Sequence, residues 1–284
     1  MKAIIMAGGR GSRLESLTNH CPKPMLPVLN QPILAHLLNL LKRHHIHEVI
    51  ITVQYMADQI EDFFGDGRDF GLVIHYAREE RPLGTAGGVK NAQPYLNKRP
   101  FLIISGDAIT DIDLNQARQF HHAKRSLVTL ILTKVDDPRP YGLVMTDQHG
   151  RIKHYQEKPT AEAILTNTVN TGIYIMEPSV LNMMEPNVAY DFSYDIFPQL
   201  LAQNDPLFGY LAAGYWRDIG SRPHYQAAIT DALAGKVNLT PQKPPSIEWL
   251  WRTGCNRSSE AAPVGLLPPL LQSASPSLKP VEQV

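Results

Sequence analysis

Cysteine is scarce in this chain of 284 residues, and its two cysteines, Cys21 and Cys255, lie far apart. Structural zinc sites use cysteine or histidine ligands at short, paired spacings, and neither cysteine belongs to such a pattern. A secreted domain held together by disulfides would carry more cysteines, so this composition suits a reducing compartment better. The sequence therefore predicts a cytoplasmic protein without a structural zinc site.

The chain also lacks an excess of charge of either sign, because 27 lysine and arginine residues balance 27 aspartate and glutamate residues. A general attraction to nucleic acid or to an anionic membrane needs a surplus of positive charge. No stretch approaches the roughly 20 apolar residues of a membrane span, and the first apolar run is too short for the core of a signal peptide. We therefore expect neither nucleic acid nor membrane as a partner, and any anionic ligand must be held locally.

In the first half of the chain, short β-branched runs alternate with amphipathic stretches, which is typical of βα units and a parallel sheet. We expect a doubly wound α/β sheet, in which a ligand binds beyond the carboxyl ends of the strands. The expected strands cover residues 3–7, 48–53, 72–77, 101–105 and 127–133, and the expected helices cover residues 33–41, 56–64, 86–96 and 114–122.

From Tyr141 the pattern changes to shorter strands at 141–147 and 151–157, separated by a turn at His149-Gly150. Such a pair of strands predicts an antiparallel hairpin. A further strand at 169–176 precedes two helix-like segments at 177–184 and 194–201. The fold class predicted for the whole chain is therefore a Rossmann-like, doubly wound mixed sheet with a small antiparallel part.

The composition changes again after Lys236, because residues 241–284 contain 8 of the 23 prolines and show no sustained hydrophobic period. A segment of this kind cannot easily bury a core of its own. We therefore expect one folded domain over residues 1–236 and a proline-rich tail over 237–284, which is partly disordered.

Glycines follow the first strand directly, in the run Gly8-Gly9-Arg10-Gly11-Ser12-Arg13, and Pro22-Lys23-Pro24 comes next. Glycines at this place let backbone N–H groups approach a phosphate chain, while Arg13 and Lys23 add charge-assisted contacts. The Rossmann spacing would need glycine where Leu14 stands, and no Walker lysine follows. The run predicts a phosphate-binding loop, although a tight turn with two solvated cations is the simpler alternative.

These residues, AGGRGSRL and then CPKPMLPV, resemble the G-G-x-G-[ST]-R-L and P-K-P signature of the nucleotide-diphosphate-sugar pyrophosphorylases, which are sugar-1-phosphate nucleotidyltransferases. Over about residues 1–236 the resemblance continues in order through PLGTAGG, SGD, YG, EKP, NTGIY and WRDIG. The pattern is most similar to mannose-1-phosphate guanylyltransferases and to relatives that act on heptose or glucose 1-phosphates. It implies a nucleotidyltransferase fold and a reaction that joins a nucleoside triphosphate to a hexose 1-phosphate and releases pyrophosphate, with GTP and mannose 1-phosphate as the leading pair.

The resemblance also implies the roles of individual residues. Asp107 and Asp218 would hold Mg²⁺, a hard cation that suits carboxylate ligands, and Lys158 would meet the sugar phosphate. The catalytic residues implied are Arg13, Lys23, Asp107, Lys158 and Asp218. The nucleotide-binding residues implied are Ala7, Gly8, Gly9, Gly11, Gln54, Gly84 and Thr85, and the sugar-binding residues are Gly142, Glu157, Asn170 and Gly172.

Other acidic and histidine residues are given simpler roles. Asp111 and Asp113 form a D-x-D pattern, but they lie beyond the strand end and are interpreted as a loop residue and a helix N-cap. The pair His121 and His122, like the histidines at 44, 45 and 47, has no oriented partner in the sequence and is expected on the solvated surface.

Several alternatives remain open. The base and the sugar could differ, as in uridylyl-, thymidylyl-, cytidylyl- or guanylyltransferases acting on glucose or heptose 1-phosphate. A catalytically silent regulatory subunit that binds a sugar nucleotide is a second class, and a dinucleotide-dependent oxidoreductase, which lacks its glycine spacing here, is a third. The tail shows no six-residue repeat, so the trimerising module of related proteins is not predicted, and a homo-oligomer remains open.

Overall fold

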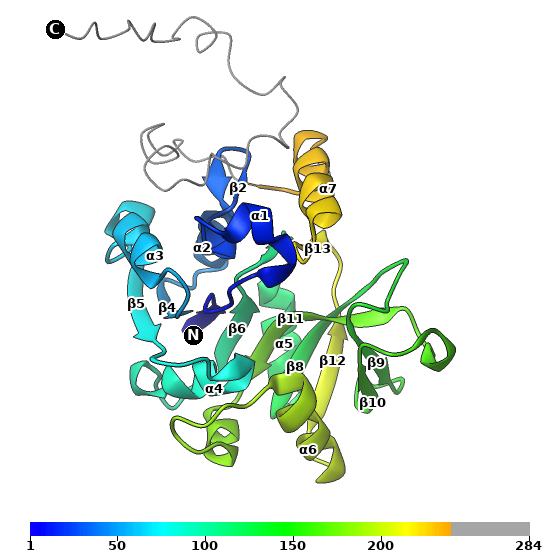
Figure 1. Cartoon of the computed structure of the whole chain (residues 1–284). Coiled ribbons are helices and arrows are strands. Elements are labelled where there is room, and N and C mark those ends of the chain that lie inside the picture. Colours follow the sequence, from blue (N-terminus) through cyan, green and yellow to red (C-terminus); the bar gives the residue numbers. More distant parts are fainter. Residues whose placement is uncertain (240–284) are drawn as a thin grey trace, which may run out of the picture.

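One mixed sheet of nine strands forms the centre of the molecule (Figure 1). The computed structural model describes residues 1–239, except for the side chains of residues 15 and 16. The strand order is β10-β9-β11-β6-β1-β4-β5, and β8 pairs with both β11 and β12. The strands are β1 (Ala3–Met6), β4 (Glu48–Val53), β5 (Val73–Arg78), β6 (Phe101–Ser105), β8 (Val128–Lys134), β9 (Gly142–Thr146), β10 (Ile152–Glu157), β11 (Thr168–Met176) and β12 (Leu207–Leu211).

Helices cover both faces of this sheet. Ile4 and Ile5 are adjacent in β1 and point to opposite faces, yet both are fully buried, as expected for a parallel strand covered on both sides. Residues of α2, α5 and α7 share a buried cluster with Ile5, and residues of α4 and α6 share another with Ile4. The α-helices are α1 (Glu15–Thr18), α2 (Ile33–Arg43), α3 (Ala57–Phe64), α4 (Gly84–Asn91), α5 (Leu114–Lys124), α6 (Phe197–Ala202) and α7 (Arg222–Leu233).

The doubly wound mixed sheet predicted from the sequence is confirmed. Strands β1, β4, β5 and β6 are parallel, and β11 runs antiparallel to β6. Strands β9 and β10 form the expected hairpin. The helix-like segment predicted at 177–184 is a 3₁₀ helix (Pro178–Met183), and a π-helical turn (Phe192–Ile196) precedes α6.

Two further strands form a small ribbon beyond the carboxyl end of β6. Strand β7 (Ala108–Thr110) pairs antiparallel with β13 (Trp216–Asp218), although more than a hundred residues separate them in the sequence. A second ribbon joins β2 (Pro27–Val28) to β3 (Gln31–Pro32). The β7–β13 ribbon brings the region of Asp218 to the end of the central sheet.

One histidine prediction is wrong. His121, expected on the surface, is only 4% exposed, and its Nδ1 lies 2.9 Å from the hydroxyl of Thr129. Burial lowers the pKa of His121 to about 4, so the ring is neutral at physiological pH. In contrast, Asp113 caps α5 as predicted, because its carboxylate accepts hydrogen bonds from the backbone N–H groups of Asn115 and Gln116.

The last described residues contact the domain. Val237 is buried, Leu239 packs against the core, and the backbone N–H of Asn238 donates to the Asp111 carboxylate at 2.7 Å. The predicted boundary at residue 236 therefore falls just before these contacts, and most of the predicted tail, residues 240–284, lies outside the described residues. None of the helices within residues 1–239 is long and apolar enough to cross a membrane.

A chain that ends after Leu239 is expected to fold and to keep most of its activity, because it retains the contacts of residues 237–239. A chain that ends after Lys236 is the comparison, and it should melt at a lower temperature since it loses the Asn238 hydrogen bond and two apolar contacts. Thermal melting and turnover of both chains check this. If the chain that ends after Leu239 is insoluble, residues beyond 239 are needed for folding.

Candidate active site

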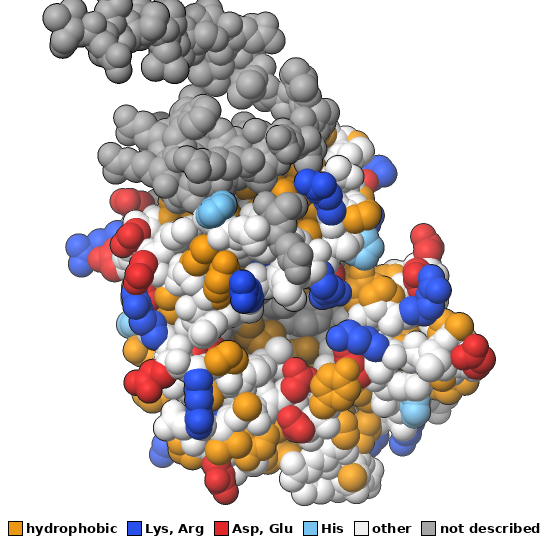
Figure 2. Space-filling view, in the orientation of Figure 1, with side chains coloured by type: hydrophobic (Ala, Val, Ile, Leu, Met, Phe, Trp, Pro, Cys, Tyr) orange, Lys and Arg blue, Asp and Glu red, His pale blue; other side chains and the backbone are white. Residues whose placement is uncertain are grey.

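A cavity of about 420 Å³ opens at the carboxyl ends of β1 and β6. Figure 2 shows this face of the molecule hollowed near its centre, with Lys and Arg side chains gathered around the hollow. The position agrees with the rule that ligands of open α/β sheets bind beyond the carboxyl ends of the strands. The predicted site residues that line the cavity are Ala7, Gly8, Gly9, Gly11, Arg13, Lys23, Gly84, Thr85 and Asp107.

The glycine loop after β1 forms one wall of this cavity. Gly11 has a φ of +68°, in the left-handed region that favours glycine, and a Cβ there would lie only 3.1 Å from the Lys23 side chain. The absence of a side chain at Gly11 therefore lets the short 3₁₀ helix Lys23–Met25 pack against the loop. Arg13 and Lys23, although ten residues apart, both face the cavity as a result.

Asp107 and Asp218 lie side by side near Lys23. Asp107 follows the carboxyl end of β6, and Asp218 reaches it because β13 pairs with β7 in a register that places Asp218 opposite Ala108. The Lys23 ammonium is 2.5 Å from one Asp107 oxygen and 4.0 Å from the nearest Asp218 oxygen. The Ser105 hydroxyl donates to the other Asp107 oxygen at 2.6 Å. One buried cation is therefore shared by two carboxylates.

The charges of this group are incompletely balanced. Burial and the nearby Asp107 carboxylate raise the pKa of Asp218 to about 6, although Lys23 and Arg13 act in the opposite direction. Burial also opposes the ionisation of Asp107, but the Lys23 ammonium outweighs it and lowers the pKa of that carboxyl. Since two partly buried carboxylates share one close ammonium, an additional cation would be stabilised here.

This donor set fits Mg²⁺. Within residues 1–239 no group of three or more His, Cys, Asp or Glu side chains is arranged to hold a metal ion, so at this position the protein offers the two carboxylates of Asp107 and Asp218. Mg²⁺ is commonly bound in this way, by one or two carboxylates, with waters and substrate phosphates as its other ligands. The magnesium ion and its two ligands remain a prediction that the local chemistry favours.

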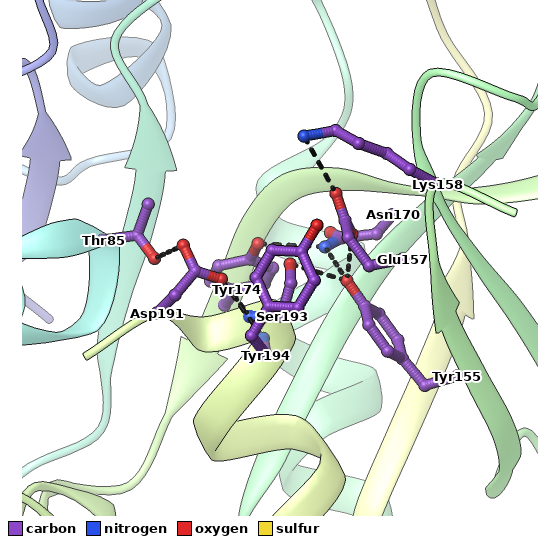
Figure 3. A network of polar contacts seen from close by, with 9 residues as sticks. All are labelled: Thr85, Tyr155, Glu157, Lys158, Asn170, Tyr174, Asp191, Ser193 and Tyr194. Atoms are coloured by element: carbon purple, nitrogen blue, oxygen red, sulfur yellow. Dashed lines mark hydrogen bonds and ion pairs between the residues drawn. The ribbon is translucent and has the colours of Figure 1, made fainter.

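The predicted sugar-side residues lie on the hairpin β9–β10 and on the neighbouring strand β11, and Figure 3 shows Glu157 and Asn170 near each other. Glu157 is paired directly opposite Gly142, and a Cβ at Gly142 would lie 2.7 Å from a carboxylate oxygen of Glu157. The Lys158 ammonium is 3.8 Å from the other oxygen of that carboxylate. Lys158 has a φ of +44°, in the left-handed region that is uncommon for a residue other than glycine.

A bulge in β11 connects the sugar side to the acidic pair. Asn170 pairs with Leu132 and Tyr174 with Leu130, so the residues between them interrupt the pairing of β11 with β8. Gly172, in this bulge, has a φ of +75° and lies against Ser105, the residue that donates to Asp107. The bulge thus places Asn170 and Gly172 next to the end of β6.

The other predicted residues are not part of the cavity lining. Gln54 packs against Gly8, and Asp218 precedes Gly220, which is part of the lining. Glu157, Lys158 and Asn170 occupy the sugar side. Whether each of these residues contacts a substrate remains a prediction, but the fold brings all of them to one end of the sheet.

Sequence reasoning missed two acidic residues that line the cavity, Glu79 and Asp191. Glu79 directly follows β5, and a polar residue after a parallel strand was a usable signal. Asp191 caps the π-helical turn through the N–H groups of Ser193 and Tyr194, so the sequence would have indicated a helix start and nothing more.

Comparison with known proteins agrees with this geometry. Residues 2–235 match the family model described as nucleotidyl transferase. A UTP–glucose-1-phosphate uridylyltransferase of Synechocystis is 37% identical over 84% of this chain and 64% of its own length. A mannose-1-phosphate guanylyltransferase of Mycobacterium tuberculosis is 38% identical over 82% of this chain and 65% of its own length. The chain therefore spans just under two thirds of the length of these curated relatives.

Solved structures give the same result for the fold. A Bacillus anthracis protein described as a candidate glucose-1-phosphate thymidylyltransferase has a TM-score of 0.75 and 27% identity, covering 85% of this chain and 98% of its own. HddC of Yersinia pseudotuberculosis, solved with GMP-PN, has a TM-score of 0.71 and 26% identity, covering 81% of this chain and 99% of its own.

Proposed function

The chain belongs to the nucleotidyl transferase family, and we propose that it is a magnesium-dependent sugar-1-phosphate nucleotidyltransferase. The observation that carries the proposal is a single cavity containing the glycine loop, Arg13, Lys23 and Asp107, with Asp218 at 4.0 Å from Lys23. The names of the relatives support the same reaction class.

In the proposed reaction, an oxygen of the sugar phosphate attacks the α-phosphorus of the triphosphate. A new phosphorus–oxygen bond forms, the bond from the α-phosphorus to the bridging oxygen breaks, and pyrophosphate leaves without a covalent enzyme intermediate. Two polyanions must be brought together, so positioning and neutralisation of charge supply most of the acceleration.

The residues of the chain divide this work. The glycine loop and Arg13 bind the triphosphate, Lys23 holds Asp107 in place, and Lys158 binds the phosphate of the sugar. Glu157 accepts hydrogen bonds from sugar hydroxyls. Mg²⁺ held by Asp107 and Asp218 would neutralise phosphate charge and polarise the phosphoryl oxygens.

The pair that we propose is GTP and mannose 1-phosphate, and Glu79 supports the choice of guanine. One Glu79 oxygen accepts the backbone N–H of Leu83 at 3.0 Å, while the other lies near Gly8 and Gly88. A carboxylate can only accept hydrogen bonds, and guanine presents two adjacent N–H donors, whereas uracil and thymine present one N–H between two carbonyl oxygens. A carboxylate in this wall therefore favours guanine.

Turnover across a grid of nucleoside triphosphates and sugar 1-phosphates tests this function. Pyrophosphate release should require both substrates and Mg²⁺, and GTP with mannose 1-phosphate should give the highest kcat/KM. A higher kcat/KM for UTP or dTTP with glucose 1-phosphate would overturn the pair and keep the reaction class. No turnover with any pair would favour a sugar-nucleotide-binding subunit without catalysis.

The change Glu79→Gln is expected to lower kcat/KM for GTP by about 10- to 100-fold, because a neutral amide replaces the carboxylate acceptor that faces the base. Relative activity with UTP should rise, since the amide can also donate to a carbonyl oxygen. The matched control is Glu80→Gln, at the exposed neighbouring position. Equal effects of Glu79→Gln on GTP and UTP would show that Glu79 does not read the base.

A further inference from the structure

A chain of hydrogen bonds joins the nucleotide side of the cavity to the sugar side (Figure 3). At one end, the Thr85 hydroxyl donates to Asp191 at 2.9 Å, and Asp191 accepts from the backbone N–H of Ser193 at 2.7 Å. At the other end, the hydroxyl oxygens of Ser193 and Tyr155 are 2.7 Å apart, and the Tyr155 hydroxyl donates to Glu157 at 2.8 Å.

The nucleotide end of this chain is firmly anchored. The backbone N–H groups of Ala86 and Gly87, in the first turn of α4, both donate to the carbonyl of Tyr190, at 2.9 and 3.1 Å. A Cβ at Gly84 would lie 2.5 Å from that carbonyl oxygen, and the φ of Gly84 is +71°. Glycine at position 84 thus permits a close backbone approach that fixes residues 190–193 against the nucleotide wall.

The proton positions at the sugar end follow from simple counting. Tyr155 has one hydroxyl hydrogen, and a carboxylate can only accept, so this hydrogen belongs to the bond with Glu157 and Ser193 must donate to Tyr155. Burial raises the pKa of Tyr155, which keeps the hydroxyl protonated. Hydrogen bonds aligned in this way polarise and strengthen one another.

We propose that Tyr155 is a positioning residue for the sugar subsite, which acts by orienting the carboxylate of Glu157, and that Ser193 and Asp191 extend this support from the nucleotide side. The inference rests on the proposed function, in which Glu157 contacts the sugar. The Glu157 side chain is only 13% exposed, and Tyr155 holds one of its two oxygens. The other oxygen, 3.8 Å from Lys158, remains for a sugar hydroxyl.

Without the Tyr155 hydroxyl, the Glu157 carboxylate would lose its short hydrogen bond and could rotate away from the sugar. Neither Tyr155 nor Ser193 lines the nucleotide cavity. The defect should therefore appear in the use of the sugar phosphate and leave the nucleotide unaffected. Substitution of a residue that merely supports the fold would change the KM values of both substrates or of neither.

The test is steady-state kinetics of Tyr155→Phe in the full chain. The KM for mannose 1-phosphate is expected to rise by about 10- to 100-fold, as for the loss of a hydrogen bond to a charged group, while the KM for GTP changes by less than about twofold. Tyr210→Phe is the matched control, because Tyr210 donates to Gln116 outside this network. Unchanged sugar KM, or equal changes in both KM values, would overturn the inference.

A second variant tests the chain of hydrogen bonds itself. Ser193→Ala removes the donor to Tyr155 and should also raise the sugar KM, and the double variant should be little worse than the worse single variant because both act through one carboxylate. If the two substitutions raise the sugar KM independently, so that their effects multiply in the double variant, Tyr155 and Ser193 do not act through one chain of hydrogen bonds. Failure of the proposed function itself would be recognised separately, by an inactive wild-type protein.

Binding of a sugar 1-phosphate to the same variants tests the inference without a measurement of turnover. Mannose 1-phosphate and glucose 1-phosphate are the probes, and protection against thermal unfolding is the readout. At least one of the two should raise the Tm of wild type and Tyr210→Phe, and should do so less for Tyr155→Phe and Ser193→Ala. Equal protection of all four proteins, or protection of none, would count against Tyr155 as a positioning residue.

Discussion

Replacing Asp107 or Asp218 by asparagine is expected to lower turnover by at least about a hundredfold, comparable to the loss of one preorganised electrostatic element. Asparagine keeps the size and shape of the side chain but removes a formal charge from the only carboxylate pair that approaches Lys23 within residues 1–239. Two phosphate-bearing substrates repel each other, and a divalent ion that bridges them needs hard, anionic ligands.

The two variants should differ in stability when magnesium is removed. The pKa of Asp218 is raised to about 6 in the folded, metal-free protein. At a pH below the pKa that this carboxyl has in the unfolded chain, the group contributes fully to the stability of the fold. That contribution is lost as the pH rises through 6. Asp218→Asn should therefore melt higher than wild type at pH 8 in a chelator. Asp107→Asn should melt lower, because Lys23 lowers the pKa of Asp107 and stabilises its ionised form.

These readouts separate a metal ligand from a structural residue. Turnover is measured at limiting magnesium, and melting is measured with chelator and with magnesium at pH 5 and pH 8. Magnesium should raise the Tm of wild type and have less effect on either asparagine variant. A folded variant that turns over near the wild-type rate at limiting magnesium would show that its aspartate is not a ligand.

Lys23→Met is expected to reduce kcat/KM by at least about a hundredfold, because it removes the cation that lies 2.5 Å from Asp107. In the metal-free protein at pH 8 it should also destabilise the fold by about 1–3 kcal/mol, since the partly buried Asp107 carboxylate loses its cation. Lowering the pH to 5 should restore part of this stability, because the carboxyl pair then takes up a proton.

The control for this substitution is Lys98→Met, which removes the same charge from an exposed position. Kinetics and melting of the two variants at pH 5 and pH 8 distinguish local from general effects of charge. If Lys23→Met retains turnover within about threefold of Lys98→Met, Lys23 has no part in the reaction.

Much of the fold followed from the sequence because its signals are local. The buried β-branched runs identified β1, β4, β5, β6 and β8, and the turn at His149-Gly150 identified the hairpin. Strand β12 (LFGYL) and helix α7 were not indicated, because β12 has a glycine at its centre and no β-branched residue, while alanines and threonine give α7 no clear apolar face. These elements are determined by packing against the sheet.

The site was predictable where motifs follow strand ends and unpredictable where distant segments meet. Gly8, Arg13 and Asp107 could be placed at the carboxyl end of the sheet because each follows a buried strand, and the structure has them lining one cavity there. The support that Tyr155 receives from Ser193 depends on a contact between residues 38 positions apart, which no local pattern reveals. Gly84 was predicted to contact the nucleotide, and the structure adds that Gly84 and Gly87 admit the close approach of residues 188–190.

The most direct test of the proposed function follows the α-phosphorus of GTP. The full chain is incubated with Mg²⁺, mannose 1-phosphate and GTP that carries radioactive phosphorus at the α position. The products are separated and identified by mass spectrometry, and the radioactivity of each is counted. We expect the label in GDP-mannose, with unlabelled pyrophosphate released in equal amount. If the label stays in GTP or appears only in GMP or GDP, and if no other triphosphate and sugar 1-phosphate pair yields a nucleotide sugar, the chain is not a sugar-1-phosphate nucleotidyltransferase.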